Sequence, residues 1–332
     1  MTSSGQPEIA VIIVNYGTAA LAVEAVDSVL GGDHGGRLVE VHLVDNASPG
    51  GDADLLREIH GANGWQGRVT LYLEAVNHGF GRGNNLVLEQ LAARPAPPDL
   101  VFLLNPDARL QGETLAALAD FLDAHPRAAA AGAQILRPGS GVVTSAFRFP
   151  GVASEFAHAL SFGPVSKLLA RSAVALPPEL PTRPVDWVAG AAVMLRMQAL
   201  RDLGGFDSDF FLYYEEVELM YRLRCAGWEV WHVPLAQVVH HEGVATGVRS
   251  ADAAPGRRPD YWYDSFGLYQ RKTRGRLGAL IVTGARLLGW SLNRPLAWVL
   301  GRKPAGPPGW GDGMWRRVVR PLLGLTATEV RR

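Results

Sequence analysis

Residues 10–30 read AVIIVNYGTAALAVEAVDSVL, and this stretch decides the fold class. Residues 10–14 form a short, wholly apolar run that ends at Asn15 and Tyr16. Apolar residues then recur at helical spacing over residues 19–30. A strand followed by an amphipathic helix is a βα unit, so the stretch predicts an α/β protein with a largely parallel sheet.

The same pattern of a strand ending in a polar residue returns twice. Residues 41–44 are apolar apart from His42 and stop at Asp45, and residues 100–104 stop just before Asn105-Pro106-Asp107. Open α/β sheets bind ligands beyond the carboxyl ends of their strands, so Asn15, Asp45 and Asp107 are candidates for one cleft. Taken singly, each of the three is equally well explained as a turn or cap residue.

The composition predicts a folded protein with a well-filled core, since the chain has 332 residues, of which 48% are hydrophobic. The single Cys225 excludes an internal disulfide and a cysteine-built zinc site. The first residues, MTSSGQPEIA, lack the pattern of a secretory signal. We therefore expect a cytoplasmic protein, either soluble or peripheral on the inner face of the cell membrane.

The net charge of zero conceals an asymmetry. Residues 257–332 carry fifteen Lys and Arg against four acids, a net charge of +11, and hold five of the nine tryptophans. Residues 277–294 have a broad apolar face and a narrow polar stripe formed by Thr283, Arg286, Asn293 and Arg294. This helical extension is expected either to bind an anionic membrane surface or to pack on the rest of the protein.

The middle of the chain is less regular. Residues 137–185 are rich in Pro, Gly and Ser and predict a long, partly helical loop region over the sheet. Residues 186–195 predict one strand returning to the core, and residues 216–226 an amphipathic helix closed by Gly227.

A glycine-rich stretch, NHGFGRGNN at residues 77–85, predicts a loop that opens a helix over residues 86–92. Its spacing does not match the dinucleotide-binding fingerprint, which argues against a hydride-transferring dehydrogenase. The glycines would let the backbone approach a flat or anionic ligand. A simple turn is the alternative.

Residues 205–228, GFDSDFFLYYEEVELMYRLRCAGW, place Glu215 and Glu216 directly behind an aromatic run. Two adjacent carboxylates in apolar surroundings are costly unless something compensates their charge, and perturbed catalytic acids and bases arise in such places. The alternative is the exposed first turn of a helix, where acids favour the helix dipole.

Asp107 follows a fully apolar strand, where packing explains an acid poorly. A carboxylate there can bind Mg²⁺ or Mn²⁺ if phosphate oxygens and waters supply further ligands. The short strand that ends in His240 and His241 is a candidate source of a second protein ligand.

Seven ordered motifs, spread over residues 9–245, resemble the inverting family-2 glycosyltransferases with a GT-A fold, particularly the rhamnosyltransferase-like branch. They are VIIVNY, VDNAS, NHGFGRGNN, LLNPDA, DWVAGAAVML, the 205–228 stretch and VVHHEG. The resemblance implies one Rossmann-like nucleotide-sugar-binding domain with a mixed central sheet over residues 1–250. Its donor half would cover residues 8–110 and its acceptor half residues 111–250, with residues 251–332 as a helical extension.

The resemblance also implies roles for individual residues. The donor nucleotide would lie against Asn15, Tyr16, Asp45, Asn77, Gly81, Asn84 and Asn105. Asp107 and His240 would hold a divalent metal ion, Mg²⁺ or Mn²⁺. Of the acid pair, Glu216 would be the catalytic base, with Glu215 as the alternative because the family usually has Asp in place of Glu216. The acceptor would meet Asp186, Trp187 and Tyr214.

The function implied is transfer of a sugar, with L-rhamnose from dTDP-rhamnose favoured, to a glycan or polyprenyl-diphosphate-linked acceptor in cell-surface polysaccharide synthesis. Two other functions stay open on the sequence. One is a sugar-nucleotidyltransferase, although the turn at residues 16–18 lacks the basic, glycine-rich loop that a triphosphate needs. The other is a catalytically silent sugar-binding or scaffold protein on the same fold. No nucleic acid partner is expected.

Overall fold

The computed structural model describes residues 8–62, 65, 67–241 and 256–325. These residues form two compact units. The first contains the residues up to 147 together with residues 176–211 and those from 215 onward to the end of the last strand. The second contains residues 148–175, 212–214 and the C-terminal residues from 256.

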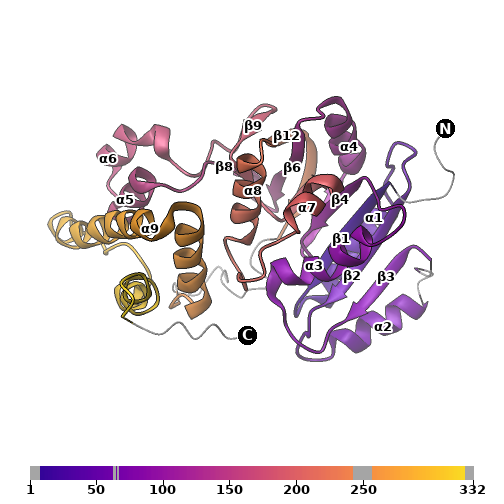
Figure 1. Ribbon diagram of the computed structural model, residues 1–332, viewed down its shortest axis with the longest axis horizontal. Helices are drawn as coiled ribbons and strands as arrows, with labels where there is room; N and C mark the ends of the chain where they lie inside the picture. Colours follow the sequence, from indigo (N-terminus) through magenta and orange to yellow (C-terminus); the bar gives the residue numbers. More distant parts are fainter. Residues whose placement is uncertain (1–7, 63–64, 66, 242–255, 326–332) are drawn as a thin grey trace. The chain divides into compact units, whose positions relative to one another are not determined.

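The first unit starts with the predicted alternation of strands and helices (Figure 1). Its first elements are β1 (Ile9–Asn15), α1 (Ala19–Leu30), β2 (Val39–Asp45), α2 (Asp52–Ala62), β3 (Val69–Leu73), α3 (Gly79–Ala92) and β4 (Leu100–Leu104). The later ones are β5 (Ala108–Gln111), α4 (Thr114–Ala124), β6 (Ala128–Arg137), β7 (Gly141–Val143), β8 (Ala146–Phe147), β9 (Arg183–Val185), β10 (Trp187–Val188), β11 (Ala192–Arg196), α7 (Met197–Leu203), α8 (Glu215–Cys225) and β12 (Glu229–His240).

The main sheet is mixed, which confirms the predicted fold class. Its strand order is β3-β2-β1-β4-β11-β6-β12-β5, with β7 and β9 paired to its members. β1 to β4 are parallel to one another, whereas β11 runs antiparallel to both of its neighbours. The start of β11 therefore lies beside the end of β4, with Ala192 opposite Leu104.

Helices bury both faces of this sheet, which explains why its strands are apolar without alternation. One core joins α1, α2 and α4 to the strand face that carries Val11 and Ile13. The other joins α3, α7 and α8 to the face that carries Ala10, Ile12 and Val14.

The prediction of one strand over residues 186–195 is wrong. β10 pairs with β8 in a separate two-stranded sheet, and β11 enters the main sheet after a break at residues 189–191. The two sheets pack closely because Gly132 of β6 has no side chain. A Cβ placed there would lie 2.5 Å from Cβ of Val188.

The glycine-rich stretch at residues 77–85 is also mostly helix, since α3 begins at Gly79. Its glycines are used for packing inside the protein. Gly79 has φ +76°, and a Cβ there would overlap the carbonyl oxygen of Phe211. A Cβ on Gly83 would lie 2.9 Å from Val14. Glycine spacing alone could not distinguish close packing from ligand approach.

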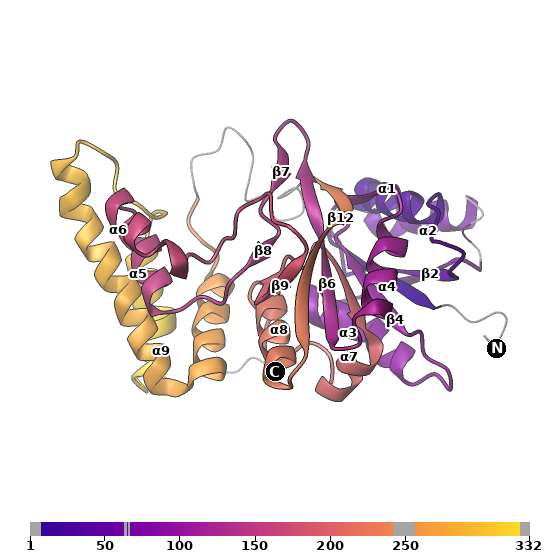
Figure 2. The ribbon, with the colours of Figure 1, turned by 90° about the horizontal axis from the view of Figure 1, so that it is seen from above.

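The second unit is helical. It comprises α5 (Val152–Leu160), α6 (Gly163–Leu168), a 3-10 turn at Ala170–Ser172, α9 (Asp260–Val299), α10 (Trp310–Met314), a π-helical turn at Trp315–Val319 and α11 (Arg320–Leu322). α9 bends sharply at Gly275, where φ is 69° and ψ is 178°, so it consists of two arms (Figure 2). α5 packs along α9 and lies beside it in Figure 2. By its contacts, the segment 148–175 is thus part of this helical unit, whereas the sequence predicted a loop over the sheet.

Three of the four residues of the predicted polar stripe of α9 face inward, whereas Arg294 is exposed. Thr283, Arg286 and Asn293 are buried, whereas Leu277, Ile281 and other apolar residues of the same arm are exposed. Among the described helices, none is both long enough and apolar enough to span a membrane.

We predict that Gly132→Ala destabilises the protein by about 2 kcal/mol or more, because the added methyl group overlaps Val188. Urea unfolding of the single and double variants measures this. Val188→Ala in the same chain removes the two Cγ atoms that would lie 2.6 and 2.7 Å away but keeps Cβ at 2.5 Å, so it relieves part of the overlap and the double variant should lose less stability than the sum of the two single changes. Strict additivity would contradict the packing described here.

Candidate functional site

Asp107 and His240 meet at one edge of the sheet. β12 pairs antiparallel with β5 so that His240 lies opposite Ala108, which directly follows Asp107. Nε2 of His240 is 2.9 Å from Oδ1 of Asp107 and 3.2 Å from Nδ2 of Asn105. Both Asp107 and His240 are buried. The two residues predicted as metal ligands are therefore in direct contact.

His241 faces a different partner. Its backbone N–H donates to the carbonyl oxygen of Asp107, while its Nε2 lies 3.0 Å from the guanidinium of Arg109. Arg109 in turn pairs with Glu24 at 2.9 Å. Of the two adjacent histidines, His240 has its ring beside Asp107 and His241 has its ring beside Arg109, a geometry that favours His240 as the partner of Asp107.

The donor set at Asp107 suits a divalent cation. Carboxylate oxygen and imidazole nitrogen are ligands that Mn²⁺ accepts, and Nδ1 of His240 is a buried nitrogen without a hydrogen-bond partner. Across the described residues, no group of three or more His, Cys, Asp and Glu side chains could hold a metal ion. The described part of the chain thus offers two such ligands here, and a bound ion would need the rest from outside, as from diphosphate oxygens and water.

Asn15 holds the ends of β1 and β2 together. Its Nδ2 donates to Oδ1 of Asp45 at 3.0 Å and is 3.1 Å from both Ser48 Oγ and Asp52 Oδ2. Its Oδ1 accepts from the backbone and the hydroxyl of Thr18. The buried amide is fully engaged, so its position favours fixing the carboxylate of Asp45 over direct contact with a ligand.

The neighbouring Tyr16 is different, because 40% of its surface is exposed. Its ring is available to a flat ligand at the end of β1. Asp52, which also accepts from the backbone N–H of Ala19 at 2.9 Å, was not predicted as a site residue. An acid at the start of a helix is ordinary helix capping in sequence, so no signal distinguished it.

Three asparagines organise the turn before α3 and the loop after α7. Nδ2 of Asn46 bridges to Asn77 and to the carbonyl of Gly79, and its Oδ1 accepts from the N–H of His78. Asn85 pairs with both backbone groups of Phe206, at 2.9 and 2.8 Å. The sequence placed Asn46 and Asn85 within motifs but gave them no role.

Two further predicted donor residues lie on α3, and both are buried. Nδ2 of Asn84 donates to the carbonyl of Phe80, while its Oδ1 is buried without a hydrogen-bond partner. Gly81 lies against the side chains of Phe206 and Glu215. The unpartnered amide oxygen of Asn84 is the free polar atom on this helix.

Glu215 and Glu216 open α8 but are not the exposed first turn that sequence allowed. Glu215 is buried beside Gly81, and Glu216 is half-buried beside Gly190. Each has an Oε2 that is buried without a hydrogen-bond partner. Burial raises the pKa of Glu215 well above its usual 4.5, and the charge of Glu216 adds to this. Burial also raises the pKa of Glu216.

The acid pair lies at the same sheet edge as Asp107. The N–H of Asn105 donates to the carbonyl of Ala191 at 2.9 Å, and a Cβ on the adjacent Gly190 would lie 3.4 Å from Cβ of Glu216. Direct contacts through Asn105, Ala191 and Gly190 thus connect the Asp107–His240 pair to Glu216. Tertiary structure assembles residues that are more than 100 positions apart in the sequence.

The tyrosines before the acid pair have an unusual backbone. Tyr213 and Tyr214 both have positive φ, 71° and 68°, which is costly for residues with a side chain. The ring of Tyr214 packs within the second unit against Phe266 and Tyr269, and burial raises the pKa of its hydroxyl. Its predicted role in acceptor binding therefore competes with a packing role.

The other two predicted acceptor residues lie around β10. Trp187 stacks on Phe147 with ring centroids 4.0 Å apart, and Asp186 is 3.4 Å from Arg224. Both are half-buried. The indole of Trp187 is thus part of the packing between β8 and β10, as the sequence had allowed.

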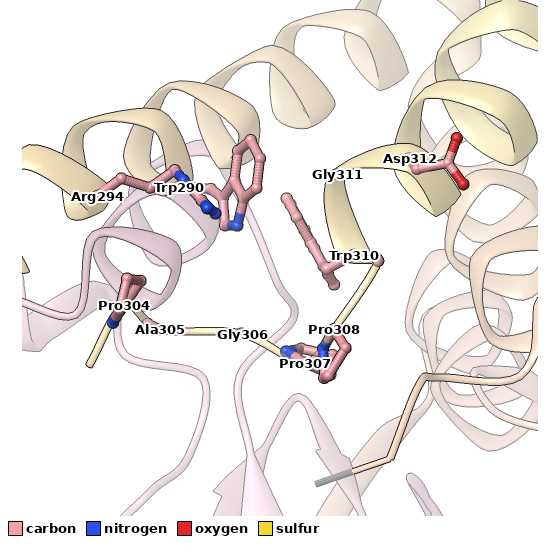
Figure 3. A pocket seen from close by; sticks show the side chains of 11 residues that line it. Trp290, Arg294, Pro304, Ala305, Gly306, Pro307, Pro308, Trp310, Gly311 and Asp312 are labelled. Carbon is pink, nitrogen blue, oxygen red and sulfur yellow. The ribbon is translucent and has the colours of Figure 1, made fainter.

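A cavity of about 660 Å³ contains none of the predicted site residues. It is lined entirely by residues 290–312 of the second unit, including two tryptophans, Arg294 and a proline-rich loop (Figure 3).

Known proteins resemble this chain in sequence and in fold. An L-rhamnosyltransferase of Mycobacterium tuberculosis (strain CDC 1551 / Oshkosh), named for N-acetylglucosaminyl-diphospho-decaprenol, is 33% identical over 220 residues, covering 64% of this chain and 69% of the relative. The rhamnosyltransferase WbbL of Escherichia coli (strain K12) is 28% identical over 176 residues, covering 51% and 63%. The crystal structure of GalNAc-T7 with UDP, GalNAc and Mn²⁺ superposes with a TM-score of 0.55 at 14% identity, covering 90% of this chain and 59% of that one, and supports the GT-A type of fold.

Two family models match. The model described as "Glycosyl transferase family 2" matches residues 10–155, and the one described as "Glycosyl transferase family group 2" matches residues 100–306, well over half of the chain. Together they span both the donor-side motifs and the acid pair. The chain therefore belongs to glycosyl transferase family 2 and is a glycosyltransferase with the rhamnosyltransferases among its relatives.

Proposed function

We propose that this enzyme transfers L-rhamnose from dTDP-rhamnose, with inversion, to a glycan carried on a polyprenyl diphosphate. The observation that carries the proposal is the convergence of Asp107, His240 and Glu216 at one sheet edge. The name of the Mycobacterium tuberculosis relative supports both the sugar and the kind of acceptor. We place the reaction on the cytoplasmic side of the membrane, as a step in cell-surface polysaccharide synthesis.

Asp107 and His240 would hold a divalent metal ion, Mn²⁺ or Mg²⁺, together with the diphosphate of the donor. When bound, such an ion stabilises the negative charge that develops on the leaving diphosphate. The solved structure of GalNAc-T7 with Mn²⁺ supports a metal in this type of fold. The contact between Asp107 Oδ1 and His240 Nε2 already brings both donor atoms to one point.

Glu216 would act as the base that takes the proton of the attacking acceptor hydroxyl. The carboxylate must be positioned and accessible, and Glu216 is half-buried whereas Glu215 is buried against Gly81. A raised pKa makes the Glu216 carboxylate a stronger base than an exposed glutamate. Gly190 lies beside the first carbons of the Glu216 side chain, where a Cβ on residue 190 would be at ordinary contact distance.

The nucleotide would lie at the ends of β1, β2 and β4. Tyr16 offers an exposed ring for the base, and Asp45, fixed by Asn15, offers a carboxylate for the ribose. Asn77, Gly81 and Asn84 would border the donor on the side of α3, and Asn105 would do so beside the metal. Asp186, Trp187 and Tyr214 would meet the acceptor.

We predict that Glu216→Gln lowers turnover by about 10²-fold to 10⁴-fold, the usual share of general-base catalysis, while the donor still binds. Glu215→Gln should keep a much larger share of turnover. Release of dTDP from dTDP-rhamnose is measured with Mn²⁺ or Mg²⁺ and N-acetylglucosaminyl-diphospho-polyprenol as acceptor. The reverse ranking of the two variants would assign the base to Glu215, and no turnover of wild type on any nucleotide-sugar would favour a silent sugar-binding protein.

We predict that His240→Ala abolishes metal-stimulated turnover, whereas the adjacent His241→Ala leaves most of it, since the ring of His241 faces Arg109. Titration of each apo variant with Mn²⁺, followed by electron paramagnetic resonance, gives an independent readout. Equal Mn²⁺ affinity in the two variants would contradict the assignment of His240.

We predict that Glu215→Gln stabilises the protein at neutral pH. The raised pKa of Glu215 means that folding disfavours its ionised form, so a free-energy cost appears as the pH rises above the unfolded pKa of 4.5 and is complete above the folded pKa. The neutral amide escapes that cost. The melting temperature should rise by about 2 °C or more at pH 7.5, and the gain should vanish near pH 4.

The matched control is Glu58→Gln on α2, where the side chain is exposed. That change should leave the melting temperature unaltered across the same pH range. If Glu215→Gln lowers the melting temperature at pH 7.5, the Glu215 carboxylate has a compensating partner and its pKa is not raised.

A further inference from the structure

The second arm of α9 presents an apolar stripe to the outside. Nine of its exposed positions recur at spacings of one, three and four residues, and at 3.6 residues per turn they lie within about 60° of one line along the helix, whereas the exposed Arg294 lies about 100° from that line. They are Leu277, Ile281, Gly284, Leu288, Ser291, Leu292, Pro295, Trp298 and Val299. Leu277 is 73% exposed, Val299 71% and Trp298 84%.

The opposite side of the same arm is buried within the second unit and includes the polar residues Thr283, Arg286 and Asn293 among small and apolar ones. Arg286 forms a buried ion pair with Glu155 of α5, and its guanidinium lies 5.2–5.5 Å from the rings of Phe266, Trp262 and Trp310. Nδ2 of Asn293 donates to the carbonyl of Leu160 at 2.8 Å. These bonds fix the rotation of the helix, so the leucines cannot turn inward.

This orientation is the reverse of that in a helix on a water-facing surface, where the apolar side is buried and the polar side is solvated. A continuous apolar stripe left outside is costly in water and marks an interaction surface. The medium outside this arm should therefore be apolar.

The charges around the stripe favour an anionic lipid surface as the partner. Residues 265–311 contain eight Lys and Arg and no Asp or Glu. Arg276 lies at the start of the arm, and Arg302 and Lys303 follow its end; all three are exposed. A second copy of this chain would bring like charges together across a symmetric interface, whereas an anionic lipid surface neutralises them.

The cavity in Figure 3 is lined by Trp290 and Arg294 of the same arm, which lie beside the stripe on another side of the helix. Its walls include the indoles of Trp290 and Trp310, with centroids 5.4 Å apart, and the Arg294 guanidinium lies 4.9 Å from the Trp290 ring. Tryptophan and arginine side chains are favoured where hydrocarbon meets headgroups. The side chains that line the cavity are thus of the kinds favoured at a membrane–water boundary.

We propose that the arm of α9 from residue 277 to residue 299 lies in the headgroup region of an anionic membrane, with Leu277, Ile281, Leu288 and Leu292 in the apolar layer and the cavity at the boundary. The surface is inferred from the second unit alone. Its use, to bring the enzyme to a lipid-linked acceptor, rests on the proposed function.

The test is co-sedimentation of the full chain with vesicles of phosphatidylcholine alone or mixed with phosphatidylglycerol, without donor or acceptor. Wild type should bind the mixed vesicles. Part of the bound protein should dissociate at high salt, because salt screens the electrostatic contribution to binding. Ile281→Gln with Leu288→Gln should weaken binding by about tenfold or more, since two apolar side chains are lost from the layer. Both positions are exposed, so the fold should tolerate the change.

The control is Leu235→Gln, which alters an even more exposed leucine of the first unit and should bind vesicles as wild type does. Equal binding by the double variant and wild type would overturn the proposal. So would a wild-type dimer, seen in sedimentation velocity, that ignores vesicles and becomes monomeric in the double variant. Neither result involves sugar transfer, so failure here is distinct from failure of the proposed function.

Discussion

The candidate site depends on one close contact that only glycine allows, at Gly79, while Gly81 and Gly190 lie at ordinary contact distance from the acid pair. Gly79 fits under the carbonyl of Phe211, Gly81 lies against Glu215, and Gly190 lies against Glu216. These approaches bring α3, the loop after α7, and the start of α8 to the edge where β1, β2 and β4 end. A side chain at Gly79 would overlap the backbone and push the acid pair away from Asp107 and His240.

The same contacts set the electrostatics. Because packing removes water from the acid pair, the pKa values of both Glu215 and Glu216 are raised, and Glu215 is raised further by the charge beside it. A buried carboxylate with one oxygen left without a hydrogen-bond partner is unfavourable for stability, and such a cost is typical of catalytic sites. Within the proposed function, a divalent ion at Asp107 and His240 would supply positive charge to this acidic edge.

In the helical unit, a buried ion pair sets the orientation of α9. The interior of this unit includes that ion pair, Glu155 with Arg286, enclosed by aromatic rings, while leucines of the same helix face outward. Removing either charge would leave the other uncompensated, so the ion pair specifies one rotation of α9. That rotation leaves the apolar stripe exposed, and the basic residues around it have no acidic neighbours in sequence.

The sequence by itself determined the α/β class, the strands that end in Asn15, Asp45 and Asp107, the helix behind Glu216 and the family resemblance, because apolar periodicity and motif order are local properties. It could not separate His240 from His241, or Glu215 from Glu216, since adjacent residues share every local signal. The sequence predicted a loop over residues 79–85, although α3 begins at Gly79, and one strand over residues 186–195, although the strand is interrupted at residues 189–191. It also left open which face of α9 is buried. Tertiary structure decided the helix at Gly79, the strand break and the buried face of α9, and it supplies the geometry that favours His240 and Glu216, because these features depend on strand register and on contacts between residues more than 100 positions apart, such as Asp107 with His240 and Glu155 with Arg286.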